Sequence, residues 1–166
     1  MKNTFPPSGA IALCVIFILS MIAFPSIAYG APARDAAAVF ADVEGKEWIL
    51  SEVKTGGITV RVDRQKLEAD GMGGFFVISF NEGRLSGIGA PNRYFGPYTA
   101  AANRTINIGT IASTRMAAFK EPDDIKEHEY FDYLSKVKRW DLWEGRLELS
   151  SSNSKGTEVV LTLVCQ

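Results

Sequence analysis

Short runs in which apolar and polar residues alternate make up most of the chain from residue 47 onward, and turn signals separate them. In the run 58–62, apolar residues alternate with Thr59 and Arg61, which is typical of a strand with one buried and one solvated face. The stretch 64–74 is polar and contains glycine, so we expect a loop there. The runs expected to form strands are 47–53, 58–62, 75–80, 84–88, 105–108, 111–119, 140–142, 147–149 and 159–164.

One helix is predicted to begin near Asp124. Asp124 and Glu127 have the spacing of a capping box, and Pro122 just before them suits the entry to a helix. The apolar residues that follow at helical spacing are Tyr130, Phe131, Leu134 and Val137. Because this spacing places them on one face, we expect the helix to pack that face on the sheet.

The spacing of the runs is typical of a barrel or a sandwich. Antiparallel pairing of neighbouring strands is the simplest arrangement, and closing the sheet removes its exposed edges. The expected fold class is therefore mainly β (α+β), with a small antiparallel barrel-like sheet of about eight strands and one packed α-helix.

The apolar run 10–24, preceded by Lys2 as the only charge, indicates an export signal. At about 1.5 Å per residue, this run is too short to cross the roughly 30 Å core of a membrane comfortably. Small residues suit cleavage after Gly30, with an alternative cut after Ala33. We expect a signal peptide at 1–30, a linker at 31–42, one domain at 43–166 and a location in the periplasm or cell envelope. An uncleaved membrane anchor is the alternative.

The composition narrows the range of partners. The chain has 18 Lys and Arg residues against 19 Asp and Glu residues, so no basic excess favours nucleic acid. Of the 2 cysteines, Cys14 lies in the predicted signal, which leaves Cys165 as the only thiol of the mature chain and no disulfide. We expect Cys165 to pack at the end of the last strand, with an intermolecular bridge as the alternative.

The segment 86–98 is rich in glycine and proline, so its backbone is steered through turns. Aromatic residues among them indicate a loop that its own side chains hold in place. The candidate binding residues of this region are Asn92, Arg93, Tyr94, Tyr98, Thr114 and Arg115. The alternative is structural: Asn92 forms an Asx turn or a left-handed conformation, and the tyrosines brace the loop.

The sequence shows no clear set of catalytic residues. A hydrolase needs a base, and His128 is the only histidine. The possible nucleophiles are Ser86, Ser113 and Cys165, none of which lies in a nucleophile elbow. A hydrolase is therefore kept as a remote alternative, and no catalytic residue is expected.

An acidic group near the start of the predicted helix offers a possible metal site. Its members are Glu121, Asp123, Asp124, Glu127 and Glu129, with His128 among them. Acidic residues in the first turn of a helix are explained more simply by capping and by the helix dipole. We therefore expect neither a metal nor a cofactor.

Several short motifs follow one another between residues 43 and 164. They are Gly45-Lys46-Glu47-Trp48-Ile49-Leu50, Ser86-Gly87 with Asn92-Arg93-Tyr94, Gly96 and Tyr98, Thr114-Arg115-Met116-Ala117, Glu129 with Phe131 and Leu134, and Leu147-Glu148-Leu149. In this order and spacing the chain resembles the META domain family, which includes HslJ-like heat-shock proteins. The resemblance implies a small antiparallel barrel-like sheet with one helix, a location in the envelope and no established enzymatic activity.

The resemblance also brings out one difference. Family members commonly carry a cysteine just before the asparagine of the loop and another shortly after Thr-Arg-Met, and these two are suited to pairing. Here the two positions hold Pro91 and Ala118. A role based on that disulfide is therefore not expected for this chain.

Together these observations predict an exported, non-catalytic envelope protein that acts as a partner-binding or stress-related scaffold. The expected partner is an envelope protein or an apolar ligand, with no nucleic acid, and with membrane contact only through an uncleaved signal. The alternative function is a carrier of a lipid or an apolar peptide. A barrel of about eight strands holds either packed side chains or one small ligand.

Overall fold

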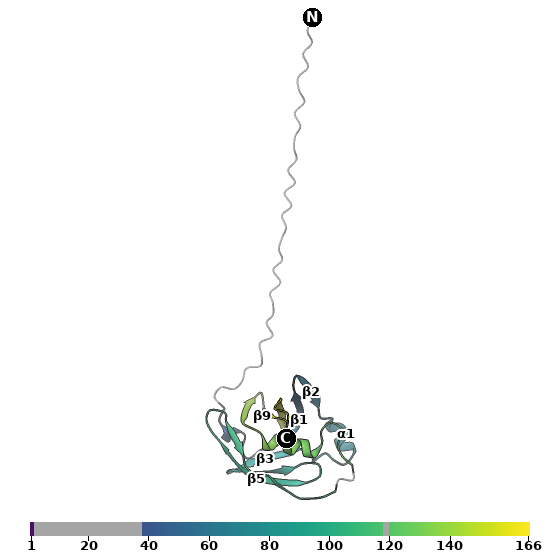
Figure 1. Ribbon diagram of the computed structural model, residues 1–166, viewed down its shortest axis with the longest axis vertical. Coiled ribbons are helices and arrows are strands. Elements are labelled where there is room, and N and C mark those ends of the chain that lie inside the picture. Colours follow the sequence, from purple (N-terminus) through teal and green to yellow (C-terminus); the bar gives the residue numbers. More distant parts are fainter. Residues whose placement is uncertain (2–37, 118–119) are drawn as a thin grey trace. The chain divides into compact units, whose positions relative to one another are not determined.

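The computed structural model describes residue 1, residues 38–117 and residues 120–166 (Figure 1). The predicted signal beyond Met1, including Cys14, the linker up to residue 37, and Ala118 lie outside the described residues. No helix in the described part is long and apolar enough to span a membrane. In chain order the elements are a 3-10 helix η1 (Phe40–Asp42), β1 (Glu47–Thr55), β2 (Ile58–Arg61), α1 (Arg64–Ala69), β3 (Val77–Asn81), β4 (Arg84–Ile88), β5 (Arg93–Ala100), β6 (Ile106–Ile108), β7 (Ala112–Ser113), α2 (Glu127–Ser135), β8 (Arg139–Trp143), β9 (Arg146–Ser152) and β10 (Glu158–Cys165).

The strands form one antiparallel sheet in the order β6-β5-β4-β3-β1-β10-β9-β8, with β2 added to β1 and β7 added to β5. The two ends of this path meet. Ile106 N donates to Lys138 O at 3.0 Å, and Trp140 N donates to Arg104 O at 3.0 Å. The sheet is therefore a nearly closed barrel, which confirms the fold class that the alternating pattern predicted.

Side chains fill the interior of this barrel. Trp48 and Leu161 are fully buried, as their places in the alternating runs predicted. Phe40 packs edge to face against Phe80 and Trp140, with ring centroids 5.3 and 5.1 Å apart. Because Phe40 belongs to the stretch 31–42 that we expected to be a linker, the end of that stretch is part of the packed domain.

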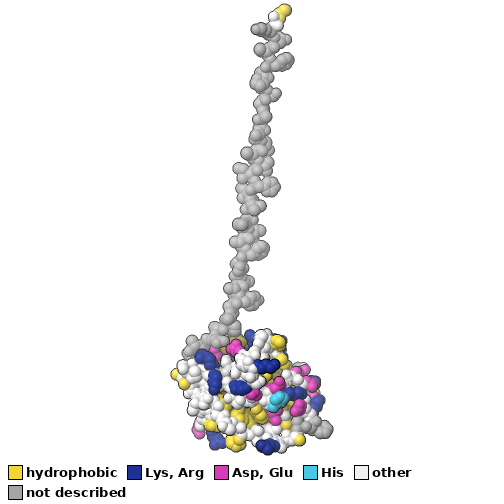
Figure 2. All heavy atoms as spheres, in the orientation of Figure 1, with side chains coloured by type: hydrophobic (Ala, Val, Ile, Leu, Met, Phe, Trp, Pro, Cys, Tyr) yellow, Lys and Arg dark blue, Asp and Glu magenta, His cyan; other side chains and the backbone are white. Residues whose placement is uncertain are grey.

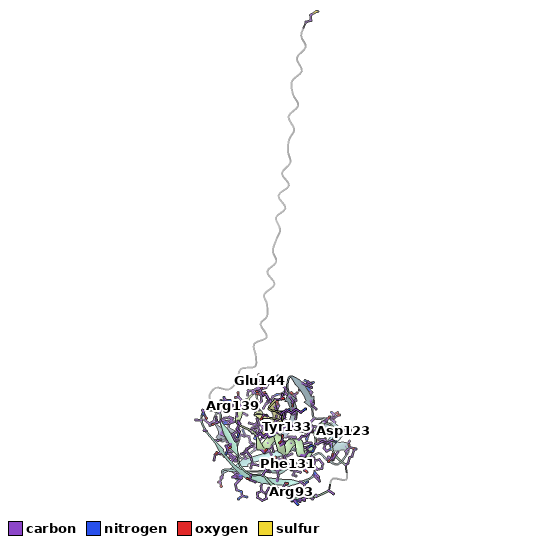
Figure 3. The ribbon with its side chains drawn as sticks, viewed as in Figure 1. Arg93, Asp123, Phe131, Tyr133, Arg139 and Glu144 are labelled. Atoms are coloured by element: carbon purple, nitrogen blue, oxygen red, sulfur yellow. The ribbon has the colours of Figure 1, made fainter. Side chains whose placement is uncertain are left out.

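Helix α2 packs Tyr130 and Leu134 into the core, and Figure 3 shows Phe131 and Tyr133 on the same helix. It begins at Glu127, so the predicted start near Asp124 and its capping box are wrong. The capping contact is made by Glu129, whose Oε2 accepts from the N–H of Lys126 at 3.0 Å. The Asp124 carboxylate accepts instead from the N–H of a residue far away in the sequence, Asp63, at 3.0 Å.

The stretch 64–74 is not wholly a loop, because it begins with the short helix α1. The carboxylate of Asp63 accepts from Lys66 N at 3.0 Å and caps this helix. Leu67 is buried in the core, and Arg64 Nη1 donates to Phe75 O at 2.9 Å. Arg64 Nη2 also donates to Gly73 O. The buried Leu67 and these two contacts of Arg64 therefore hold a helix that the polar composition did not predict.

The predicted run 58–62 has its buried face only at Val62, because all four residues of β2 are exposed. Ile58 is 73% exposed. β2 pairs with β1 alone, so none of the described residues forms a layer over its apolar side.

Two further expectations need correction. Strand β7 covers only Ala112–Ser113 of the predicted run 111–119, and residues 118–119 of that run lie outside the described residues. Cys165 is exposed at the end of β10 rather than packed. Cys165 is paired with Trp48 of β1, but the pairing of β10 with β9 ends at Val164, so Cys165 has a neighbouring strand on one side only.

Candidate functional site

Both donor hydrogens and the oxygen of the Asn92 side chain form hydrogen bonds within the protein. Its Oδ1 accepts from Thr114 Oγ1 at 2.9 Å and from Met116 N at 2.6 Å. Its Nδ2 donates to Glu127 Oε2 at 2.6 Å and to Met116 O at 3.4 Å. Asn92 is 7% exposed. Since an amide side chain offers two donor hydrogens and one oxygen with two lone pairs, none is left for a ligand.

Glu127 holds the turn that precedes Asn92. Its Oε1 accepts from Ala90 N at 2.5 Å and from Asn92 N at 2.7 Å. Gly89 makes the close approach possible, because a Cβ there would lie 2.6 Å from Glu127 Oε1 and 2.8 Å from the Phe131 ring. Glu127 is also the first residue of α2, where a carboxylate is favoured by the helix dipole.

Arg93 and Thr114 are joined through their backbones. Arg93 N donates to Thr114 Oγ1 at 3.1 Å, and Thr114 N donates to Arg93 O at 3.0 Å. The side chains of Arg93 and Arg115 are exposed, and Figure 3 shows Arg93 at the outer edge of the ribbon. The structure therefore brings Asn92, Arg93 and Thr114 together as predicted, but as a braced turn whose arginine points outward.

The two tyrosines of the candidate set point into the barrel. Tyr94 donates to Val77 O at 3.0 Å, so the 2.8 Å contact between the two hydroxyls is donated by Tyr130. Tyr98 donates to Glu44 and packs edge to face on Phe80 at 5.1 Å. The predicted loop 86–98 is wrong for most of its length, because residues up to Ile88 belong to β4 and Arg93–Ala100 form β5. The roles of both tyrosines are structural, but they are inward-facing residues of a strand and do not brace a loop.

Burial shifts the acidity of both tyrosines of the hydroxyl pair. It raises the pKa of Tyr94 well above its ordinary value of 10, and the neighbouring Tyr130 hydroxyl adds to this shift. Burial also raises the pKa of Tyr130. Both groups are therefore neutral hydrogen-bonding groups at physiological pH.

The residues considered for hydrolysis are spread over the surface. His128 is exposed on α2 and is the cyan side chain in Figure 2. Ser86, Ser113 and Cys165 are exposed on three different strands. The described residues include no hydrogen bond between His128 and any of these three side chains.

The acidic residues near the helix have separate tasks. Asp123 pairs with Lys66, and Glu121 lies 3.5 Å from Lys126 Nζ. Asp124, Glu127 and Glu129 accept from backbone N–H groups. Within residues 38–117 and 120–166, no group of three or more His, Cys, Asp or Glu residues is placed to hold a metal ion.

A surface groove of about 380 Å³ lies over the outward faces of β3, β4 and β5, and we call it the phenylalanine groove. Val77 pairs with Ile88 on its floor, and Ser86 pairs with Phe95 on the next rung. Phe95 is 51% exposed, and the Arg84 guanidinium lies 5.7 Å from its ring. The residues that line the groove are Glu47, Gly74, Val77, Ser79, Ser86, Gly87, Ile88, Arg93, Tyr94 and Phe95.

A model of the META domain matches residues 41–163, so the chain belongs to the META domain family. Its fold is similar to the NMR structure of a protein from Burkholderia xenovorans, with 22% identity, a TM-score of 0.60 and 99% of each chain covered. A crystal structure of a DUF4847 family protein from Bacteroides vulgatus matches with 16% identity and a TM-score of 0.48, over 75% of this chain and 96% of that one. No curated protein matches the chain. The META domain is not a known enzyme family.

Sequence reasoning found the turn but missed its main partner. Glu127 was assigned to a capping box, whereas its carboxylate serves a turn that is 35 residues away in the sequence. The donors of the turn indicate that it needs a hydrogen-bond acceptor from elsewhere in the chain. Closely spaced backbone N–H groups and a buried asparagine amide need a carboxylate or carbonyl acceptor, but the sequence does not show which acidic residue provides it.

We predict that Glu127→Gln lowers the free energy of unfolding by about 1–3 kcal/mol, because an amide N–H then faces a backbone or side-chain N–H donor. Urea denaturation measures the change. The matched control is Glu144→Gln on the exposed turn between β8 and β9, where we expect a change within about 0.5 kcal/mol. Equal effects of the two substitutions would contradict the role assigned to Glu127.

The tyrosine pair predicts a loss of stability in alkaline solution. In the unfolded chain Tyr94 and Tyr130 ionise near pH 10, whereas in the folded protein they stay neutral. Their contribution to stability is therefore complete below pH 10 and declines as the pH rises above it. Tyr94→Phe is expected to lower stability at neutral pH by about 1–3 kcal/mol and to reduce the decline above pH 10. Denaturation curves at several pH values test this, and an unchanged decline refutes it.

Proposed function

We propose that this META-domain protein is an exported, non-catalytic module of the cell envelope that binds a protein partner. The observation that carries the proposal is the phenylalanine groove, where a half-exposed aromatic ring borders an apolar floor of Val77 and Ile88. An exposed apolar patch with polar residues around it is a usual feature of interaction sites. Export is supported by the apolar run 10–24.

The charges around the groove indicate the chemistry of the partner. Arg93 lines the groove and the exposed Arg84 lies against the Phe95 ring, whereas Glu47 is the only acidic residue among the described residues that line it. A partner segment with one apolar side chain next to a carboxylate fits this arrangement. The apolar side chain packs on Phe95 and the floor, and the carboxylate pairs with an arginine.

The carrier alternative receives no support from the interior of the barrel. The space that a lipid tail or a peptide needs is occupied by buried side chains, among them Trp48, Phe80 and Trp140. A ligand there has to displace close-packed rings, which costs several kcal/mol. Binding at the surface requires no such rearrangement.

Export predicts a shortened product. In the cells that express it, the protein is expected to lose residues 1–30 and to begin at Ala31. Intact-mass spectrometry of the envelope fraction measures this. A full-length chain in the membrane fraction would favour the uncleaved anchor, and a full-length chain in the cytoplasm would contradict export.

If the phenylalanine groove binds the partner, Phe95 contributes to binding and the exposed Ile58 on β2 does not. A photo-crosslinking residue placed at Phe95 is expected to capture an envelope protein that the same residue at Ile58 does not. Phe95→Ser is expected to abolish binding of that protein, because it removes the apolar contact. Ile58→Ser is the matched control, since Ile58 is also exposed on a strand. Capture of the same proteins at both positions, or of none, would refute the proposal.

A further inference from the structure

Strand β2 has one edge that no other described strand covers. β1 is the only strand of the described part that pairs with it, and Figure 1 shows β2 at the margin of the domain. Just beyond this pairing, Val62 N donates to Ser51 O at 2.9 Å. Because bonded and non-bonded residues alternate along an antiparallel pair, every second residue of β2 bonds to β1, as Val62 does. Thr59 and Arg61 therefore direct their backbone N–H and C=O groups to the open edge.

The same strand has an exposed apolar face. Ile58 is 73% exposed and Val60 is 38% exposed. Proteins commonly protect an open edge with a proline, a bulge or a charge on the apolar side. β2 contains no proline, its pairing with β1 has no register shift, and its one charged residue, Arg61, pairs with Glu52 on the opposite face. An open edge beside an uncovered apolar face is suited to the addition of another strand.

A second copy of β2 complements this edge when the two strands run antiparallel with Thr59 opposite Thr59 of the second copy. The Thr59 N–H of each copy then donates to the Thr59 C=O of the other. Ile58 of each copy lies opposite Val60 of the other, so the exposed apolar side chains cover one another. Directly opposed threonines and directly opposed apolar side chains both stabilise antiparallel pairs.

The charge of Arg61 selects this register among the symmetric ones. With Thr59 at the centre, the Arg61 residues of the two copies are four positions apart along the strand, which is about 13 Å at roughly 3.3 Å per residue. Centring the pair on Val60 brings them to about 7 Å. Centring it on Arg61 sets the two guanidinium groups directly opposite each other, where like charges are destabilising. The Thr59 register therefore combines the apolar contacts with the widest separation of the charges.

We propose that two copies of this protein associate through antiparallel pairing of their β2 strands, centred on Thr59. Because both copies use the same edge, the contact closes on itself and adds no third copy. β2 has only 4 residues, so the contact is smaller than the roughly 1,200–2,000 Å² of stable interfaces, and the dimer is weak and reversible. The contact does not involve the phenylalanine groove on β3, β4 and β5, so the failure of one proposal leaves the other standing.

Sedimentation equilibrium of the protein purified from the cells that express it tests the association. Between micromolar and millimolar concentration, the mean mass is expected to rise from that of one chain toward that of two. A mass that stays at one chain at millimolar concentration overturns the proposal, and so does a mass that rises beyond two chains.

Four variants test whether β2 makes the contact. Thr59→Pro removes the N–H at the open edge but no hydrogen bond to β1, so it is expected to abolish the dimer while the circular dichroism spectrum stays unchanged. Thr59→Ala is the matched control, which retains the N–H and is expected to dimerise. Ile58→Ser is expected to weaken association about tenfold, because it removes an apolar contact from each copy. Phe95→Ser is expected to leave association unchanged, and an effect as large as that of Ile58→Ser would place the contact at the phenylalanine groove and overturn the proposal.

Disulfide cross-linking tests the register. In a chain that also carries Cys165→Ser, Thr59→Cys places the two thiols on directly opposed residues, whose Cα atoms are about 5.5 Å apart and within reach of a disulfide. Arg61→Cys places them about 13 Å apart, which is too far. Lys155→Cys, on the exposed turn between β9 and β10, is the control for random collision. Thr59→Cys is expected to form cross-linked dimers faster than the other two variants, and equal rates for all three overturn the proposal.

Discussion

The carboxylate of Glu127 is the contact on which the arrangement of the domain depends. It accepts from two backbone N–H groups of the turn 89–92 and from the Asn92 amide. Without it these partly buried donors lack an acceptor, at about 1–3 kcal/mol each. Because Glu127 is the first residue of α2, the same contact fixes where the helix begins on the barrel. Tyr130, one turn further on, then meets the Tyr94 hydroxyl.

The sequence predicted the parts of the fold that depend on local periodicity. Alternation located most strands and showed that Trp48 and Leu161 face the core, and helical spacing located α2. The prediction from sequence failed where a hydrogen-bond partner that is distant in the sequence determines the local structure. Asp124 has the spacing of a helix cap, but the N–H of Asp63 takes its carboxylate. Spacing rules compare only neighbouring residues, so they do not reveal such competition.

The same reasoning explains strand β2. Its alternation predicted a buried face, yet Ile58 is exposed because β2 lies off the main path of the sheet and pairs only with β1. Alternation shows which side chains share a face, but the neighbours of the strand decide whether that face is covered. For the candidate binding residues, the residue types alone do not distinguish a binding role from a structural role. Asparagine and tyrosine suit a binding site and a structural role equally. Glu127, 35 residues away, gives Asn92 its structural role, and the inward face of β5 does so for Tyr94 and Tyr98.

The interior of the barrel is packed, and every hydrogen-bonding group of the Asn92 side chain has a partner. A partner that binds the wall of the barrel can therefore contact only the outward side chains of its strands. Each of these strands supplies one set of residues to the core and the other set to the outer surface, because side chains alternate with a period of two. Tyr94 is buried, whereas Phe95 beside it is exposed at the phenylalanine groove. Outward substitutions therefore leave the core contacts in place, so binding at the phenylalanine groove is separable from folding.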